Sequence, residues 1–215
     1  MNSEHRLSPG AEKALLAAGL WALFGLGYTG TNHWNVGRET ARIGLPLDAA
    51  IQYSPWWEIV YSFVYFFVML PVPLVAERKF FRRVCGAYVT AMLLSFACFV
   101  AFPVSYPRPD IVAETFFDWT VLLNYRLDPP NNCLPSLHIA IAYLAAFVSW
   151  RLSRPFGWVA LAVATAIAVS TLFVKQHYVL DIAGGILVAA LAHRLWFRNR
   201  LTVHGRRVML AGDRR

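Results

Sequence analysis

The chain has 215 residues, of which 58% are hydrophobic and only 15% carry a charged side chain, and its formal net charge is +8. Soluble domains carry about 25% charged residues, so this composition excludes an ordinary soluble globular protein and indicates an integral membrane protein. The positive charge does not indicate a nucleic-acid-binding protein, because the basic residues concentrate in the segments that connect apolar stretches.

Six apolar stretches approach the about 20 residues that a membrane-spanning helix needs. We expect spanning helices at 11–28, 56–76, 84–101, 136–150, 156–174 and 178–197. The first and fourth stretches are short for a span. Pro71 and Pro73 predict a kink or an early end in the second, because proline interrupts helical hydrogen bonding. The sequence thus predicts an all-α integral membrane protein, a six-transmembrane-helix bundle that forms a single membrane domain over residues 1–215.

The basic residues predict the orientation of this bundle. If the amino terminus is cytoplasmic, 15 of the 20 Lys and Arg residues lie in inner segments and 5 in outer segments. This imbalance follows the positive-inside rule and places both termini in the cytoplasm. We therefore expect a multi-pass plasma (inner) membrane protein with its active site on the extracytoplasmic face. The basic tail, 198–215, is typical of an anchor to lipid headgroups.

Two outer loops stand out. The first, 29–55, mixes Trp34 and Leu45 with Arg38 and Arg42, which is typical of an amphipathic segment lying in the membrane interface. The second, 103–135, is the longest polar stretch and contains six prolines. Structureless loops of that length inside compact domains are usually functional or disordered. Because this loop leads into Pro-Ser-Leu-His138, we expect it to be functional.

His177 and Asp181 are four residues apart at the start of the last apolar stretch, which puts them on one helix face. A carboxylate bonded to one ring nitrogen fixes the tautomer of the imidazole and leaves the other nitrogen free to attack. An unpaired carboxylate inside an apolar helix would be costly, so the pair indicates function. We interpret His177 as a nucleophile and Asp181 as the group that orients it.

A second group of residues fits phosphate. Ser136 is a natural N-cap for the fourth helix, whose free amides could hold an anion, and His138 beside it could protonate a leaving oxygen. Arg108, between two prolines, offers a guanidinium fork that suits phosphate. Lys175 is a further candidate cation, although a lysine that merely reaches toward the headgroups fits equally well. The predicted phosphate ligands are Arg108, Ser136 and Lys175.

Other interpretations of these residues remain open. His177 and Asp181 could simply cross-link helix ends, or they could bind a metal with His138 as third ligand. A small proton-coupled transporter would also use a buried histidine–aspartate pair. It predicts polar groups along the helices, whereas 182–189 contains none. Gly184 and Gly185 in that stretch are better explained as close helix-packing positions.

Together these motifs resemble those of the type-2 phosphatidic acid phosphatase (PAP2) superfamily. The matching residues are Arg108-Pro109, Pro135-Ser136-x-His138, and Ser170 followed by His177 and Asp181. The resemblance covers roughly 102–185, with a core of about 56–197. It implies that His177 forms a phosphohistidine, that Asp181 orients it, and that His138 acts as general acid and then base. It implies no cofactor and no metal.

The chain departs from the phosphatase pattern at two expected cations, where it has Ala101 and Thr171. A phosphomonoester brings nearly two negative charges and a diester only one, so fewer cations favour a diester. The segments around Arg108 and 170–181 resemble most the inositol phosphorylceramide synthase and sphingomyelin synthase-like branch. We therefore expect a phospholipid substrate and a lipid alcohol acceptor. A phosphatase acting on phosphatidate, phosphatidylglycerophosphate or a polyprenyl diphosphate is the alternative, and Lys175 could replace one missing cation.

Overall fold

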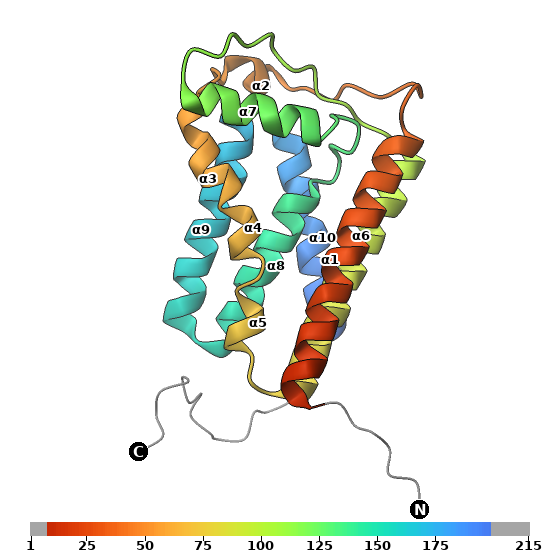
Figure 1. The fold of residues 1–215 in the computed structure, drawn as a ribbon, viewed down its shortest axis with the longest axis vertical. Coiled ribbons are helices and arrows are strands. Elements are labelled where there is room, and N and C mark those ends of the chain that lie inside the picture. The colour runs from red at the N-terminus through yellow and green to blue at the C-terminus, as the bar shows by residue number, and fades with distance from the viewer. Residues whose placement is uncertain (1–7, 199–215) are drawn as a thin grey trace, which may run out of the picture.

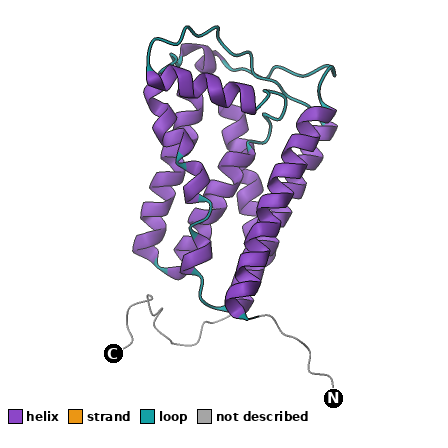
Figure 2. Cartoon of the chain, in the orientation of Figure 1, coloured by secondary structure: helices purple, strands orange, loops and turns teal. Residues whose placement is uncertain are grey.

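The computed structural model describes residues 8–198, and every regular element in that range is a helix (Figure 2). The long helices are α1 (Pro9–Trp34), α6 (Arg78–Ala101), α8 (Leu137–Leu152), α9 (Arg154–Phe173) and α10 (Val179–Phe197). They run roughly along one direction and form a bundle (Figure 1). The expected all-α class is confirmed for this part of the chain. The predicted tail, 198–215, lies outside the described residues except for Arg198.

Five helical segments are long and apolar enough to cross a membrane: Pro9–Trp34, Pro55–Leu74, Arg78–Ala101, Arg154–Phe173 and Val179–Phe197. They cover the first, second, third, fifth and sixth predicted spans. Because several segments can cross a membrane, the chain is a multi-pass membrane protein. The fourth predicted span, 136–150, is the apolar helix α8, which has 16 residues. Its length of about 24 Å is less than the about 30 Å of a bilayer core. Helix length therefore supports five of the six predicted spans and does not establish the sixth, which is α8.

Helix α8 lies in the middle of the bundle. It packs against α9 and α10, and nearly all of its side chains are buried. Gly185 of α10 allows the close approach, because a Cβ there would lie 2.7 Å from the carbonyl oxygen of Ser136. At Gly184 a Cβ would lie 3.0 Å from the side chain of Leu134. The predicted packing role of both glycines is confirmed, and it fixes the start of α8 against the start of α10.

The second span is broken into short pieces: the 3₁₀ turn η1 (Pro55–Trp57), α3 (Glu58–Ser62), α4 (Val64–Phe67) and α5 (Pro71–Leu74). Pro71 opens the last piece, and neither Pro71 nor Pro73 has an N–H to donate to the preceding turn. The interruption expected at these prolines is confirmed. The span is consequently the least regular wall of the bundle.

One end of the bundle is covered by α2 (Pro46–Ala50), α7 (Phe116–Leu127) and the loops that flank these two helices (Figure 1). Helix α7 lies within the outer loop 103–135, so this loop is not irregular throughout. Thr115 and Asp118 form a capping box: the Asp118 amide donates to the Thr115 hydroxyl, and the Asp118 carboxylate accepts from the Thr115 amide at 2.9 Å. This Thr-x-x-Asp spacing is a known helix-start pattern and could have predicted α7.

The first outer loop is also more ordered than a single interfacial segment. Helix α1 continues to Trp34, and α2 follows after an extended stretch. The Ala41 amide donates to the carbonyl of Pro103 at 2.9 Å, and the Cys133 amide donates to the carbonyl of Val104 at 3.2 Å. These bonds join three segments that are distant in the sequence. The covering segments therefore fix the position of the chain that leads into α8.

Candidate active site

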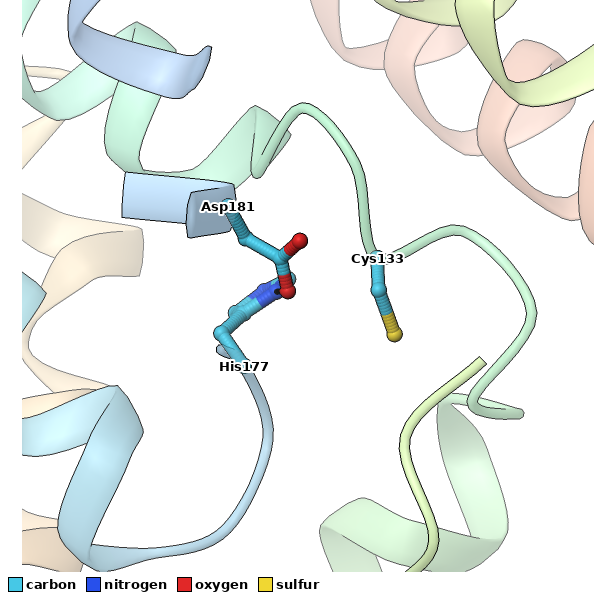
Figure 3. A group of neighbouring side chains, drawn as sticks. All are labelled: Cys133, His177 and Asp181. Carbon is cyan, nitrogen blue, oxygen red and sulfur yellow. Dashed lines mark hydrogen bonds and ion pairs between the residues drawn. The ribbon is translucent and has the colours of Figure 1, made fainter. Parts of the chain in front are cut away.

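His177 and Asp181 meet under this cover, at the start of α10. His177 Nδ1 lies 3.2 Å from Asp181 Oδ2, and both side chains are buried. The same carboxylate oxygen accepts from the amide of Tyr178 at 2.8 Å. Figure 3 shows the two side chains adjacent to each other, with Cys133 across from them on another segment. The contact fits the expected arrangement, in which the carboxylate accepts a hydrogen bond from Nδ1–H and fixes the ring.

The other ring nitrogen of His177 faces Ser136. Its Nε2 lies 3.0 Å from the Ser136 hydroxyl oxygen, and Ser136 is fully buried. Ser136 is also the N-cap of α8, because its hydroxyl accepts from the amide of Ile139 at 3.5 Å. With the Nδ1 proton on the Asp181 side, Nε2 presents its lone pair to the Ser136 hydroxyl. The two nitrogens of the His177 ring thus have different partners, the Asp181 carboxylate and the Ser136 hydroxyl.

His138 lies on the first turn of α8, and its ring centroid is 6.3 Å from that of His177. The two imidazoles are thus at the same end of the bundle and close enough to contact one phosphoryl group. The remaining neighbours of the ring are aromatic, with centroids about 6 Å away: Phe24, Tyr28, Tyr61 and Tyr65. Its Nδ1 is buried and has no hydrogen-bond partner among the described residues. A buried, unpartnered ring nitrogen is available for proton transfer.

Arg108 reaches the site indirectly. Its guanidinium donates to the carbonyl oxygens of Tyr125 at 2.7 Å and Asp128 at 2.6 Å, and to Oε1 of Gln176 at 2.6 Å. It also stacks on the Tyr125 ring, 4.2 Å from the ring centroid. Gln176 precedes His177, so Arg108 contacts the residue next to His177 in the chain. Its role as a phosphate ligand stays a prediction.

Lys175 is directed away from this group. Its ammonium donates to the carbonyl oxygens of Asp48 and Ile51, in and after α2. Its backbone adopts a positive φ of 56°, which is uncommon for a residue with a side chain. Burial lowers the pKa of the Lys175 ammonium. The residue joins α2 to the segment before His177, and its contacts do not include Ser136 or His177.

The structure brings together a different set of possible metal ligands from the expected one. Among the described residues, Cys133, His177 and Asp181 have ligand atoms within 4.8 Å of one another, and His138 is not in the group. Burial raises the pKa of the Cys133 thiol well above its usual value.

Ala101 and Thr171 occupy the positions at which the family pattern has cations, and the Arg38 guanidinium donates to the carbonyl of Val100, next to Ala101, at 2.9 Å. Ala101 ends α6, and Thr171 is buried in α9 with its hydroxyl donating to the carbonyl of Ala168 at 2.7 Å. The hydroxyl of Ser170 likewise donates to its own helix, to the carbonyl of Ile167 at 2.6 Å. Both hydroxyls are thus engaged by backbone carbonyls of α9.

Asp128 and Gln176 were not predicted as site residues. Asp128 accepts a hydrogen bond from the Tyr28 hydroxyl at 2.8 Å, which holds one of the rings around His138. Gln176 accepts from Arg108, and its own Nε2 is buried without a partner among the described residues. Only the position of Gln176 next to His177 could have indicated it. Asp128 lies between the motifs in a loop without a recognisable pattern.

Comparison with known proteins identifies one family. A sequence model described as the PAP2 superfamily matches residues 40–195, which is most of the chain. No curated protein and no solved structure matches the chain. The matched region contains the histidine–aspartate pair, His138, Ser136 and Arg108.

Proposed function

The chain belongs to the PAP2 superfamily, and we propose from this premise that it cleaves a phosphorus–oxygen bond of a membrane lipid through a phosphohistidine. Membership makes it a membrane enzyme of the phosphatase or phosphotransferase type. The observation that supports the proposal most directly is the contact between His177 Nε2 and the Ser136 hydroxyl, with Asp181 on the opposite ring nitrogen. This arrangement is that of an oriented nucleophile beside a helix N-terminus.

In the first step, His177 Nε2 attacks phosphorus, a nitrogen–phosphorus bond forms, and the phosphorus–oxygen bond to the leaving lipid alcohol breaks. His138 donates its proton to the leaving oxygen. Asp181 stabilises the imidazolium that forms, as a carboxylate does in other histidine–aspartate pairs. The Ser136 hydroxyl and the free amides of α8 hold the phosphoryl oxygens, with Arg108 supplying positive charge.

In the second step, His138 accepts the proton of an incoming hydroxyl whose oxygen attacks phosphorus, and the bond to His177 breaks. The missing cations at Ala101 and Thr171 favour a diester over a monoester, because fixed charge must replace the hydration of each phosphate charge. We therefore propose transfer of a headgroup phosphate to a lipid alcohol, as in the synthase-like branch that the motifs resemble. With water as the acceptor, the same two steps would release the headgroup phosphate from a diester, or inorganic phosphate from a monoester, and the second case would make the enzyme a lipid phosphatase.

For the membrane arrangement, we propose that α8 is the fourth of six transmembrane helices and that α2 with its flanking residues lies in the interface. The basic residues favour a plasma-membrane protein with cytoplasmic termini, so the covered end of the bundle faces outward. Cysteine accessibility on either side of sealed vesicles tests this orientation. Labelling of Asn131→Cys from the cytoplasmic side would overturn it.

The reaction itself is tested with phospholipids carrying radiolabelled phosphorus, in detergent micelles that also contain ceramide or diacylglycerol. Parallel assays use phosphatidylinositol, phosphatidylethanolamine, phosphatidylglycerol and phosphatidate. A labelled new lipid supports transfer, labelled headgroup phosphate indicates hydrolysis of a diester, and labelled inorganic phosphate alone places the enzyme among the phosphatases. Absence of all three products with every substrate would overturn the proposal.

A further inference from the structure

A pocket of about 470 Å³ opens at the end of the bundle opposite the candidate active site, where α8 turns into α9 (Figure 1). This volume is within the range of about 300–1,000 Å³ that ligand sites occupy. The wall combines cations with aromatic rings and contains no carboxylate. We call it the basic pocket, and its lining residues are Phe147, Trp150, Arg151, Arg154 and His193.

Arg151 is held in a fixed orientation at this pocket. Its Nε donates to Nε2 of His193 at 3.3 Å, and its Nη2 donates to the carbonyl oxygen of Phe197 at 2.6 Å. The guanidinium also lies over the Phe197 ring, 5.2 Å from the ring centroid. A guanidinium has five N–H groups, so these two bonds leave donors for a further acceptor. Arg151 is therefore positioned by the end of α10 without being saturated by it.

The charge of the basic pocket is not balanced within the described part of the chain. Arg154 is exposed at the start of α9, and neither Arg151 nor Arg154 has an ion pair with a carboxylate of the described residues. Arg78 and Arg82, at the same end of the bundle, both pair with Glu12. Neighbouring cations repel one another, and a bound anion relieves that repulsion. The contrast between the two groups of arginines indicates an anion at the basic pocket.

Tryptophan side chains place this end of the bundle at the membrane surface. Trp150, in the wall of the pocket, packs edge to face on Trp158 with ring centroids 4.5 Å apart. Trp158 is 63% exposed, and Trp196 at the end of α10 is also exposed. Tryptophan is enriched at the level of the lipid headgroups. The anion that meets the basic pocket at this depth is the phosphate of a phospholipid.

We propose that the basic pocket binds the headgroup phosphate of an anionic phospholipid in the leaflet opposite the active site, with Arg151 and Arg154 as its ligands. A guanidinium fork matches the geometry of phosphate. Basic pockets between membrane helices on the cytoplasmic side bind anionic headgroups. In the orientation proposed above, this leaflet is the cytoplasmic one. Trp158 and Val159, both exposed on α9 after Arg154, give the acyl chains an apolar surface.

The bound lipid connects the ends of α8, α9 and α10, because Arg151 also contacts the last turn of α10. Its effect is on the stability of the bundle. The pocket and the His177–Asp181 pair lie at opposite ends of α10, so the lipid takes no part in phosphoenzyme formation. The site is thus separate from that of the substrate.

The first experiment measures lipid-dependent melting of purified His177→Ala protein, which cannot consume the added lipid. The protein is kept in a neutral detergent at about 0.15 M salt, where exposed charges are screened beyond about 8 Å. Phosphatidylglycerol, phosphatidylcholine and inorganic phosphate are titrated separately. Phosphatidylglycerol should raise the melting temperature saturably, because a ligand of the folded state stabilises it. The other two should not. An equal rise with inorganic phosphate or with phosphatidylcholine would overturn the inference.

The second experiment locates the binding with two matched variants in the same His177→Ala background. Arg154→Gln removes a proposed ligand, whereas Arg194→Gln removes the same charge from an exposed position on α10 that does not line the pocket. Loss of charge-assisted hydrogen bonds should weaken phosphatidylglycerol binding about tenfold or more in Arg154→Gln. Arg194→Gln should weaken it by less than about fivefold, as expected of general surface charge. Equal weakening in the two variants would overturn the inference.

Folding and substrate binding are controlled in the same series. Because Arg154 is exposed, Arg154→Gln should melt at an unchanged temperature without lipid. Arg154→Lys keeps the charge but loses the fork, so it should bind with intermediate affinity. Phosphatidylglycerol that binds at the active site would be insensitive to Arg154→Gln. Native mass spectrometry should accordingly show one more retained phosphatidylglycerol with Arg154 than with Gln at this position.

Failure of the proposed function has a different signature. Wild type that forms no product and no phosphoenzyme from any phospholipid would refute that function and leave the lipid binding measured in His177→Ala unaffected. If wild type is active and Arg154→Gln binds phosphatidylglycerol as tightly as its parent, the proposed function stands and the basic pocket is not a lipid site.

Discussion

The backbone amide of Ser136 donates to the carbonyl oxygen of Asp181 at 3.1 Å. This bond joins the N-cap of α8 directly to the first turn of α10. It keeps the Ser136 hydroxyl, which contacts Nε2 of His177, close to the Asp181 carboxylate, which contacts Nδ1 of the same ring. The geometry of the site consequently depends on how closely the two helices approach.

That approach is tested at Gly185. A Cβ there would lie 2.7 Å from the Ser136 carbonyl oxygen, so Gly185→Ala must push α8 and α10 apart. We expect a loss of about 1–3 kcal/mol of stability from overpacking and a fall in kcat of about 100-fold from displacement of Ser136. Thermal unfolding in detergent and steady-state kinetics measure the two effects.

Gly30 is the matched control, because a Cβ at this exposed position in α1 meets nothing within 4 Å. Gly30→Ala should change stability by no more than about 1 kcal/mol, in the favourable direction. Equal behaviour of the two variants would contradict the close-packing role of Gly185.

His177→Ala should abolish turnover and leave the fold intact, since the side chain supplies the attacking nitrogen. The expected fall in kcat is about 10⁴-fold or more, as for removal of other catalytic nucleophiles. Rapid acid-free quenching with radiolabelled substrate should detect a phosphoenzyme in wild type and none in the variant. His193→Ala, at the opposite end of α10, is the control histidine substitution and should keep the phosphoenzyme.

Chelation distinguishes the phosphohistidine from the metal hypothesis. Exhaustive dialysis against a chelator should leave activity unchanged, because the steps proposed above use only side chains of this chain. Inactivation that is reversed by one specific metal would favour a metal site at Cys133, His177 and Asp181. In that case Cys133→Ser should weaken metal binding, whereas Cys98→Ser, an exposed cysteine outside that group, should not.

Acid should weaken the capping of α7. The hydroxyl of Thr115 lowers the pKa of the Asp118 carboxyl in the folded protein, with a further contribution from Tyr53. A lowered folded-state pKa stabilises the fold above the unfolded-state value of about 3.9, and this stabilisation is lost as the pH falls toward the folded-state value. Wild type should therefore melt above Asp118→Asn at pH 7, and the difference should shrink below about pH 4. A difference that is constant with pH would contradict the assignment.

The sequence predicted well those features that depend on local pattern. Hydrophobic length located α6, α9 and α10 to within a few residues, except at the start of α6, where the helix begins six residues earlier, at Arg78. The spacing of His177 and Asp181 predicted a contact that the structure contains. Motif order predicted that His138 and His177 lie at one end of the bundle, and their ring centroids are 6.3 Å apart.

Features that depend on tertiary contacts were beyond sequence reasoning. Lys175 was a candidate phosphate ligand because it is a cation two residues before His177 in the sequence. Its ammonium instead contacts the carbonyls of Asp48 and Ile51. The basic pocket is assembled from three helices, and no single segment carries its pattern. Asp128 reaches the ring of Tyr28 across 100 residues of sequence, which no spacing rule anticipates.

Helix α10 receives its first capping bond from outside the bundle. The amide of Val179 donates to the carboxylate of Asp48 at 2.8 Å, and the other oxygen of that carboxylate accepts from Leu45 at 2.6 Å. Two residues upstream of Val179 is His177. A fragment starting at residue 56 would retain every predicted catalytic motif, yet the helix terminus next to His177 would lose the bond from Val179 to Asp48. The minimal working unit must therefore include the segment that precedes the second span.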